Sequence, residues 1–429
     1  MKKGAFTIVA KNYFGLAEVL GSAIKKVNPE VDFHIFIADE VDDDKALGAI
    51  KQSKFFYHVA KETLDYAEDL WFDTAFKYNI TEFCTFLKPH CAEYLFGKDY
   101  DKVIYFDPDI YVFSALDPIF RELDDSFVVV TPHITTLEIN YTGNASQNDL
   151  LATGIYNLGF VAFRKCDQSS QLLSWWKSRL QDMCFVDRAD ALFTDQKWMD
   201  FIFSFFDSGI HVSRDLGRNL APWNFHERKI KSVDGAFWVT NRVTGKEDFA
   251  LIFVHYSGVN YRNFKDSNLN LPDLNLENYP DLLPIFSIYE QEVTKGRIAD
   301  FLNLSYSYNY FDNGIEILHL QRRLYRRALA NNVTYGNPFK SAPQASFYQR
   351  LKKQKLVDSS FVKNELDKMR KDTYGDYYKK VSYINKFFFI VNRLLGFKKY
   401  YILAKFFIKY FRPENQYFLL DKSDVSKTL

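Results

Sequence analysis

Short apolar runs alternate with amphipathic stretches through the first 265 residues of the chain. A set of these runs is expected to form β-strands, namely Phe6–Ala10, Phe33–Ile37, Val103–Phe106, Phe127–Val130, Leu158–Phe163 and Leu251–Val254. Apolar residues from Leu16 to Val27 recur at spacings of three and four, which predicts a helix that ends at Asn28-Pro29. A second helix is expected over residues 81–97, with a kink or turn at Pro89. This alternation of strands and helices predicts an α/β fold with a mostly parallel sheet flanked by helices.

The pattern changes after residue 265. Residues 266–284 are rich in Asn, Leu and Pro, and the chain from Ile285 onward is helical in pattern and rich in tyrosine. We therefore predict three regions. They are an α/β domain over residues 1–265, a linker and accessory helical segment over residues 266–345, and a basic, aromatic, helical C-terminal region over residues 346–429.

Composition narrows the class of protein. Of 429 residues, 47% are hydrophobic and 25% are charged, with a net charge of +1, which indicates an ordered globular chain and gives no reason to expect nucleic-acid binding. The aromatic share of 18% offers many faces on which sugars or bases can stack. The apolar stretch before Lys11 is too short for a signal peptide, so we expect a cytoplasmic protein. Its cysteines are then expected to be reduced; they are Cys84, Cys91, Cys166 and Cys184.

The clearest chemical signal is Asp107-Pro108-Asp109, which directly follows the apolar run Val103–Phe106. Ligands bind at strand ends in open α/β sheets, and two convergent carboxylates there can hold a divalent cation that in turn holds a diphosphate. The same spacing occurs at Asp42–Asp44 and at Asp99–Asp101, but those pairs lie in polar stretches. The alternative for 107–109 is a plain turn.

The sequence from Val103 to Val112 resembles the Asp-x-Asp strand of GT-A glycosyltransferases, especially those of family 8. Three further segments follow in the order typical of that family: Thr153–Phe160 is similar to its Asn-x-Gly strand, Phe193–Gln196 to its Asp-Gln segment, and His255–Gly258 to its His-x-x-Gly motif. The resemblance covers roughly residues 5–265. It implies a GT-A-like fold with a helical C-terminal extension.

The resemblance also implies a set of functional residues. Asp107, Asp109 and His255 would bind Mn²⁺ or Mg²⁺, and Asp195 and Gln196 would be catalytic in a reaction that retains the anomeric configuration. The nucleotide-sugar donor would be bound by residues spread along the chain, namely Ala10, Tyr13, Lys88, Asp107, Asn157, Gly159, Gly258 and Arg262. For individual residues the alternatives are structural: a solvated helix lysine for Lys88, a packing glycine for Gly159, and a helix cap at Asp195.

The residues expected to contact the nucleotide of the donor depart from the family pattern. Ala10 and Lys11 stand where the family has acidic residues that read uracil, although Tyr13 can still stack on a base. Tyr261 replaces the family's lysine after His-x-x-Gly, which leaves phosphate contact to Arg262 or Lys88. A UDP-linked sugar is nevertheless the expected donor. The segment Leu220–Arg228, with Trp223 at its centre, is expected either in the acceptor site or in the core.

The C-terminal region carries a second signal. Residues 379–412 contain nine Lys or Arg and no Asp or Glu. Plotted as a helix, Lys398, Lys405, Lys409 and Arg412 share one face, opposite Tyr400, Leu403, Phe407 and Phe411. This pattern is typical of a helix at an anionic membrane surface, and it fits a lipid-linked glycan acceptor. The alternative is that the aromatic residues pack on the catalytic domain.

The predicted function is therefore a metal-dependent glycosyltransferase of surface polysaccharide or lipopolysaccharide synthesis, peripheral on the inner face of the membrane. One alternative is a sugar-1-phosphate nucleotidyltransferase, which would be expected to carry a Gly-rich basic loop that Ala10–Gly15 does not provide. Another is a non-catalytic carbohydrate-binding protein on the same fold, against which the intact Asp107, Asp109 and His255 argue. Nucleic-acid binding through the basic C-terminal region is the weakest alternative.

Overall fold

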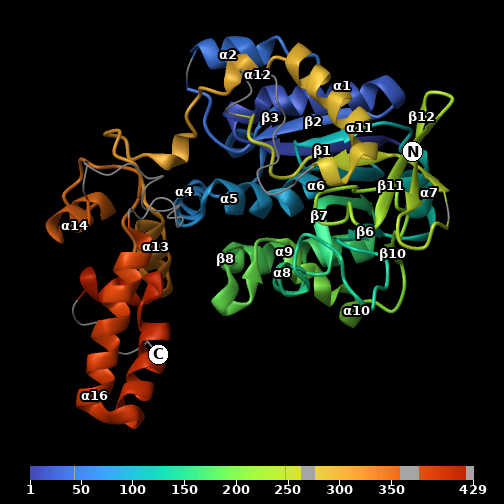
Figure 1. The fold of residues 1–429 in the computed structure, drawn as a ribbon. Helices are drawn as coiled ribbons and strands as arrows, with labels where there is room; N and C mark the ends of the chain where they lie inside the picture. Colours follow the sequence, from blue (N-terminus) through green and yellow to red (C-terminus); the bar gives the residue numbers. More distant parts are fainter. Residues whose placement is uncertain (43, 247, 262–275, 358–375, 422–429) are drawn as a thin grey trace. The chain divides into compact units, whose positions relative to one another are not determined.

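The computed structural model describes residues 1–42, 44–246, 248–261, 276–357 and 376–421 (Figure 1). The chain forms two compact units. The first unit contains residues 1–65 and 80–306, and the second contains residues 66–79 and 307–429. The predicted boundary at residue 265 lies outside the described residues, and the three predicted regions stay a prediction.

A seven-stranded sheet forms the centre of the first unit. Its strands, in spatial order, are β10 (Ile210–Val212), β6 (Val128–Pro132), β7 (Tyr156–Arg164), β4 (Lys102–Phe106), β1 (Lys3–Val9), β2 (Asp32–Ile37) and β3 (Phe56–Val59). Only β7 runs antiparallel to its neighbours; the remaining pairs are parallel. The predicted α/β class with a mostly parallel sheet is therefore confirmed.

Three smaller sheets contain the remaining strands of the first unit. Strand β14 (Phe253–His255) pairs antiparallel with β5 (Ile110–Val112), in a separate two-stranded sheet. The expectation that the segment Leu251–Val254 joins the parallel sheet was therefore wrong. This segment forms its strand hydrogen bonds with β5, which is not a strand of the central sheet. Strands β11 (Arg228–Val233), β12 (Ala236–Asn241) and β13 (Asp248–Ala250) form an antiparallel sheet, and β8 (Val186–Asp187) pairs with β9 (Leu192–Phe193).

Helices cover both faces of the central sheet (Figure 1). On one face α1 (Phe14–Val27) buries the predicted apolar stripe against alternate residues of β1 and β2, such as Ala5 and Ile35. The same face carries α7 (Asp117–Asp125), α11 (Leu283–Lys295) and α12 (Ile298–Phe301). The opposite face carries α5 (Ile80–Phe86), α6 (Lys88–Gly97) and α9 (Asp167–Met183). Pro89 lies in the first turn of α6, so the predicted break within residues 81–97 is confirmed.

Short helices fill the connections of the first unit. They are η1 (Lys11–Tyr13), α2 (Asp44–Lys51), α3 (Ala60–Thr63), α8 (Gln147–Thr153), η2 (Arg188–Asp190), η3 (Gln196–Phe201), α10 (Ile202–Phe205), η5 (Leu276–Asn278) and η6 (Pro280–Leu282). Two of these helices carry predicted site residues: η1 follows β1, and η3 follows β9.

The second unit is helical. It contains α4 (Glu68–Lys77), η7 (Ser307–Asn309), α13 (His319–Ala330), α14 (Phe347–Lys353), α16 (Tyr377–Tyr410) and η9 (Pro413–Leu419). Arg322 of α13 is buried and donates hydrogen bonds to the carbonyl oxygens of Ala75, Phe76 and Tyr78. These carbonyl groups lie at the C-terminal end of α4, where they have no hydrogen-bond partners within the helix. The Arg322 guanidinium supplies their hydrogen bonds and thereby fixes α4 to α13. Phe76 packs on the ring of Tyr325 at a centroid distance of 4.7 Å.

Candidate active site

Asp107, Asp109 and His255 converge at the point where β4 ends and the β5–β14 pair begins. The two aspartates lie in the turn between β4 and β5, and His255 is the last residue of β14. The pairing of His255 with Ile110, and a hydrogen bond from the Tyr256 N–H to the Asp109 carbonyl, hold the two segments together. The His255 Nε2 atom lies 3.1 Å from an Asp109 oxygen and 3.8 Å from an Asp107 oxygen.

These residues fit a divalent cation by their chemistry. One donor atom from each of Asp107, Asp109 and His255 lies within 4.8 Å of the others. The two carboxylates are partly open to solvent, while the imidazole is buried. A cation held here would therefore contact His255 on its protein side and could be reached by a ligand from the solvent side. Two carboxylate oxygens and one imidazole nitrogen suit Mn²⁺ and leave coordination positions free.

Lys88 connects this group to the Asp-Gln segment. Its ammonium lies 2.8 Å from Asp195 and 3.8 Å from Asp107, and it donates a 2.8 Å hydrogen bond to the Leu158 carbonyl. Burial alone would lower the pKa of Lys88, but the carboxylates of Asp195 and Asp107 raise it above its usual value. The ammonium therefore stays charged and offsets two acidic groups. The solvated alternative for Lys88 does not apply, since its side chain is buried.

Asp195 and Gln196 stand where the loop after β9 enters η3. Asp195 is the N-cap residue of η3, but its carboxylate faces Lys88 and the hydroxyl of Thr194 instead of the helix N–H groups. The Gln196 amide donates a 2.9 Å hydrogen bond to the Thr153 carbonyl. Thr194 adopts a left-handed backbone with φ of 45°, which is costly for a β-branched residue. Such strain at a loop that positions polar side chains is common in functional sites.

Gly159 of β7 gives His255 its space. A Cβ atom at Gly159 would lie 2.4 Å from Cε1 of His255, closer than any van der Waals contact allows. The Gly159 carbonyl also accepts a 2.7 Å hydrogen bond from the Asp107 N–H. Gly159 therefore lets His255 pack closely against β7, as the packing alternative expects, and its role toward a donor stays a prediction.

Comparison with known proteins finds a family resemblance over the N-terminal part of the chain. The model of glycosyl transferase family 8 matches residues 5–183. This part of the chain is therefore similar to the glycosyltransferases of family 8, in agreement with the order of the motifs.

Relatives and solved structures are similar over more than half of the chain. The chain is 24% identical over 256 residues to the uncharacterized protein YfnF of Bacillus subtilis (strain 168), a match that covers 59% of this chain and 80% of that one. It is 28% identical over 245 residues to the uncharacterized protein YfnD of the same organism, covering 56% and 72%. Among solved structures, the galactosyltransferase LgtC, in complex with donor and acceptor sugar analogs, is 15% identical with a TM-score of 0.42, covering 68% of this chain and 96% of that one.

The segment around Ala10 and Lys11 is where the sequence departs from the family's motif pattern. Lys11 is buried; its backbone N–H donates a 2.8 Å hydrogen bond to Asp39, and its ammonium donates one to the Glu40 carbonyl. An acidic side chain thus reaches the end of β1 from the segment after β2. Ala10 is buried beside it, and the ring of Tyr13 lies edge-on to Tyr261 at 6.0 Å.

The segment that follows His255 carries two further predicted donor-binding residues, Gly258 and Arg262. Gly258 adopts φ of 88°, a conformation that glycine accepts without strain, three residues beyond His255. Tyr261 is buried and its hydroxyl lies 2.7 Å from that of Tyr289, so it serves the core. Arg262 lies outside the described residues. The roles of all these residues toward a donor stay predictions.

Trp223 lies beside the candidate site. Its ring is partly buried and packs edge-on against both His255, at 5.2 Å, and His133, at 5.4 Å. Sequence reasoning missed His133 and Asn219, which both contact Asn157 of β7. A histidine three residues after the predicted strand Phe127–Val130 was the available signal for His133. Nothing local marks Asn219, because its contact depends on how the loop after β10 returns to the sheet.

Proposed function

We propose that the chain is a metal-dependent, retaining glycosyltransferase that moves a sugar from a nucleotide-diphosphate sugar, preferentially UDP-linked, to a glycan acceptor. The supporting observation is the convergence of the Asp107, Asp109 and His255 group with Asp195 and Gln196, joined by the buried ammonium of Lys88. A bound divalent cation would hold the diphosphate oxygens and offset the charge of the leaving group.

In the proposed reaction the bond between the anomeric carbon and the diphosphate oxygen breaks, and the acceptor oxygen bonds to the same face of that carbon. The acceptor proton passes to the departing diphosphate oxygen, so no separate carboxylate base is needed. The Gln196 amide nitrogen donates to the Thr153 carbonyl, and the amide oxygen accepts a 3.4 Å hydrogen bond from the Leu158 N–H. The second lone pair of that oxygen would face positive charge developing at the anomeric carbon. The Asp195 carboxylate, fixed by Lys88, would accept hydrogen bonds from sugar hydroxyls.

This proposal predicts an α-linked product from an α-linked donor. The test is proton NMR of the first product formed with Mn²⁺ and a panel of UDP-, GDP- and CDP-linked sugars, with the enzyme omitted as a control. Turnover should be greatest with a UDP-linked donor. A β-linked product would overturn the retaining mechanism, and a preference for GDP-linked donors would overturn the uridine assignment alone.

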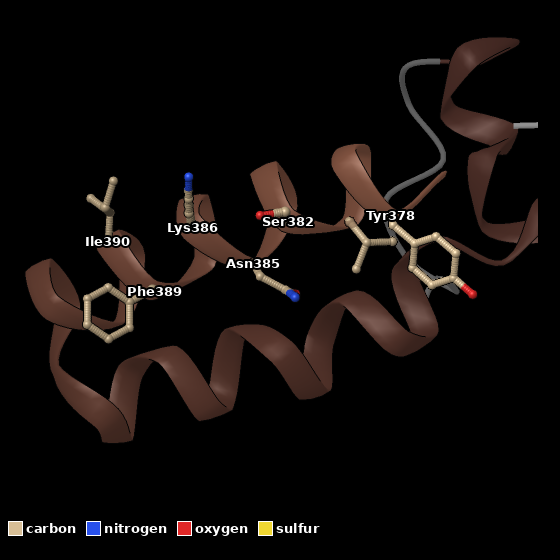
Figure 2. Close-up of a pocket in the computed structure, with 7 residues that line it drawn as sticks. Tyr378, Ser382, Asn385, Lys386, Phe389 and Ile390 are labelled. Carbon is tan, nitrogen blue, oxygen red and sulfur yellow. The ribbon is translucent and has the colours of Figure 1, made fainter. Parts of the chain in front are cut away.

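We also propose that residues 379–412 bind an anionic membrane surface, which would bring the enzyme to a lipid-linked acceptor. These residues form most of α16, which bends sharply at Gly396 into two arms that run side by side (Figure 2). No side chain of α16 is buried, and many large apolar side chains are exposed. On the first arm they are Tyr378, Tyr383, Ile384, Phe387, Phe389, Ile390, Leu394 and Leu395.

The charges of α16 lie beside this apolar surface. Lys379, Lys386 and Arg393 follow one another every seven residues and so share one stripe of the first arm. In Figure 2, Lys386 and Ile390 project from one side of that arm, and Asn385 and Phe389 from another. On the second arm, Tyr400, Leu403 and Phe407 are only partly exposed, and Tyr400 lies 6.4 Å from the Phe388 ring. The face predicted to meet lipid thus partly lies between the arms.

Lipid binding is therefore expected from the outer apolar residues and the basic stripe together. Among the described residues no helix is long and apolar enough to cross a bilayer, which leaves surface binding as the mode to test. Basic side chains near an anionic leaflet each contribute about 1 kcal/mol to binding. Truncation is a poor test, because η9 beyond α16 carries Glu414, which pairs with Arg326 of α13 at 3.1 Å.

We predict that four Lys/Arg→Gln substitutions in α16 weaken vesicle binding at least tenfold. The substituted residues are Lys386, Arg393, Lys398 and Lys405. Co-sedimentation with phosphatidylglycerol vesicles at low and high salt measures the effect, because the charge contribution is screened by salt. The matched control carries four Lys→Gln changes at exposed sites of the first unit, namely Lys51, Lys54, Lys229 and Lys246. Equal pelleting of the two variants would refute the proposal.

A further inference from the structure

A buried chain of hydrogen bonds lies behind Asn157 of β7. His133, one residue beyond β6, lies with Nδ1 3.1 Å from the Ile155 carbonyl oxygen and with Nε2 3.4 Å from the Asn157 amide nitrogen. The Asn157 amide oxygen accepts hydrogen bonds from the Gly159 N–H and from the Asn219 amide, each at 3.1 Å. All three polar side chains in this chain are buried.

The direction of each hydrogen bond follows from chemistry. A backbone carbonyl can only accept, so Nδ1 of His133 must carry the proton that points to Ile155. Burial lowers the pKa of His133 to about 4, so the ring is neutral at working pH and Nε2 carries a lone pair. That lone pair can accept only from an N–H, which fixes the Asn157 nitrogen on the His133 side.

The oxygen of Asn157 is fixed independently. The Gly159 N–H can only donate, so it requires an oxygen, and the Asn219 amide nitrogen donates to the same atom. The second hydrogen of that Asn219 nitrogen goes to the Thr131 hydroxyl at 2.9 Å. The hydrogen bond with His133 fixes the Asn157 amide nitrogen, and those from Gly159 and Asn219 fix its amide oxygen. Both lines of reasoning give the same orientation of the amide.

We propose that His133 is a positioning residue that fixes Asn157 as a hydrogen-bond donor toward the donor sugar. With its oxygen turned into the protein, Asn157 has one remaining N–H, for which the described residues provide no second acceptor. That N–H fits a hydroxyl or carbonyl oxygen of the sugar and disfavours a protonated amine. This inference rests on the proposed function, in which Asn157 lies at the donor sugar.

A second observation marks the same place as a ligand site. The amide oxygen of Asn219 is buried and has no hydrogen-bond partner among the described residues, and the same holds for the Trp223 indole nitrogen, which lies between His133 and His255. Buried polar atoms are nearly always paired in folded proteins. The unpaired acceptor belongs to a residue that contacts Asn157, and the unpaired donor to a residue that contacts His133. A sugar's hydroxyl groups are the complement that would satisfy both.

Two substitutions separate the hydrogen bonds of His133 in the full-length protein. His133→Gln places an oxygen near the position of Nε2 and can still accept from Asn157. His133→Asn places its amide near Nδ1 and keeps only the hydrogen bond to Ile155. We expect His133→Gln to keep kcat/KM for hydrolysis of a UDP-linked sugar within about threefold of wild type. We expect His133→Asn to lose about five- to tenfold, which corresponds to one neutral hydrogen bond.

Two further measurements make the role specific. Calorimetric titration of UDP with Mn²⁺ should give the same Kd for both variants, because UDP carries no sugar to meet Asn157. A long-range ¹H–¹⁵N spectrum of the wild-type histidine rings should show His133 neutral and protonated at Nδ1 between pH 6 and 8. Equal kcat/KM in the two variants, or protonation at Nε2, would overturn the inference. Absence of any turnover in the wild-type protein would instead count against the proposed function, while the ring spectrum would still test His133.

Discussion

Replacing Asp109 by asparagine should reduce metal-dependent sugar transfer by at least a hundredfold. The substitution keeps the size of the side chain but removes the charged oxygen that lies 3.1 Å from His255, so one of three converging ligands is lost. Carboxylates are preferred over amides by divalent cations that carry diphosphate, and the cation neutralises charge that develops on the leaving group. Donor hydrolysis at increasing Mn²⁺, with calorimetric titration of Mn²⁺ and UDP, measures the loss.

The chain offers a matched control for this substitution. Asp99 belongs to a second pair of aspartates with the same spacing, but its side chain is 94% exposed and lies on the surface beside Lys165. Asp99 also has φ of 62°, a conformation that asparagine tolerates, so Asp99→Asn changes charge without backbone strain. We expect this variant to behave as wild type. Unchanged turnover in Asp109→Asn, or full wild-type activity in excess chelator, would contradict the assignment.

Replacing Lys88 by methionine should have a large effect on stability as well as on activity. The buried Asp195 carboxylate would lose the ammonium 2.8 Å away, and breaking a buried ion pair on one side costs about 3–5 kcal/mol. Activity should fall by at least a hundredfold, because Asp195 and Asp107 would then repel each other or take up a proton. Urea unfolding followed by circular dichroism measures the change in the free energy of unfolding.

Two variants make the Lys88 result specific. Lys231→Met removes an ion pair of similar kind, but Lys231 and Asp248 are both exposed to solvent, so the loss of stability should be much smaller than in Lys88→Met. The double variant Lys88→Met, Asp195→Asn removes both buried charges and should recover much of the stability without recovering activity. Equal stability of Lys88→Met and Lys231→Met would show that the buried pair does not carry the energy assigned to it.

The sequence predicted the parts of the fold that depend on local patterns. Long apolar runs identified β1, β2, β4, β6 and β7, because buried central strands have few polar residues. The edge strands β3 and β10 were missed, since each is short, partly exposed and contains a histidine. The direction and partner of β14 could not be predicted either, because a three-residue strand carries no signal for the strand it will pair with.

In the candidate site, too, local motifs predicted some residues, while others depend on tertiary contacts. Asp107, Asp109 and His255 could be placed together because each follows an apolar run and a family motif contains them, and the structure brings them within reach of one another. The contact between Lys88 and Asp195 joins residues 107 positions apart, and its geometry depends on how α6 packs beneath the sheet. The hydrogen bonds of His133 and Asn219 likewise depend on loops whose paths are set by tertiary contacts.

The contact between α4 and α13 has a consequence for the order in which the chain folds during synthesis. Helix α4 is made early, but the residues that cover it, beginning at Ser307, are made more than two hundred positions later. At translation rates of about 5–20 residues per second, α4 waits roughly 10–50 s for Arg322 and Tyr325. During that interval Trp71 and Phe76, which end at 1% and 0% exposure, have no native cover. A ribosome-bound chain of this protein therefore presents an aromatic helix that chaperones can bind until the last third of the sequence has emerged.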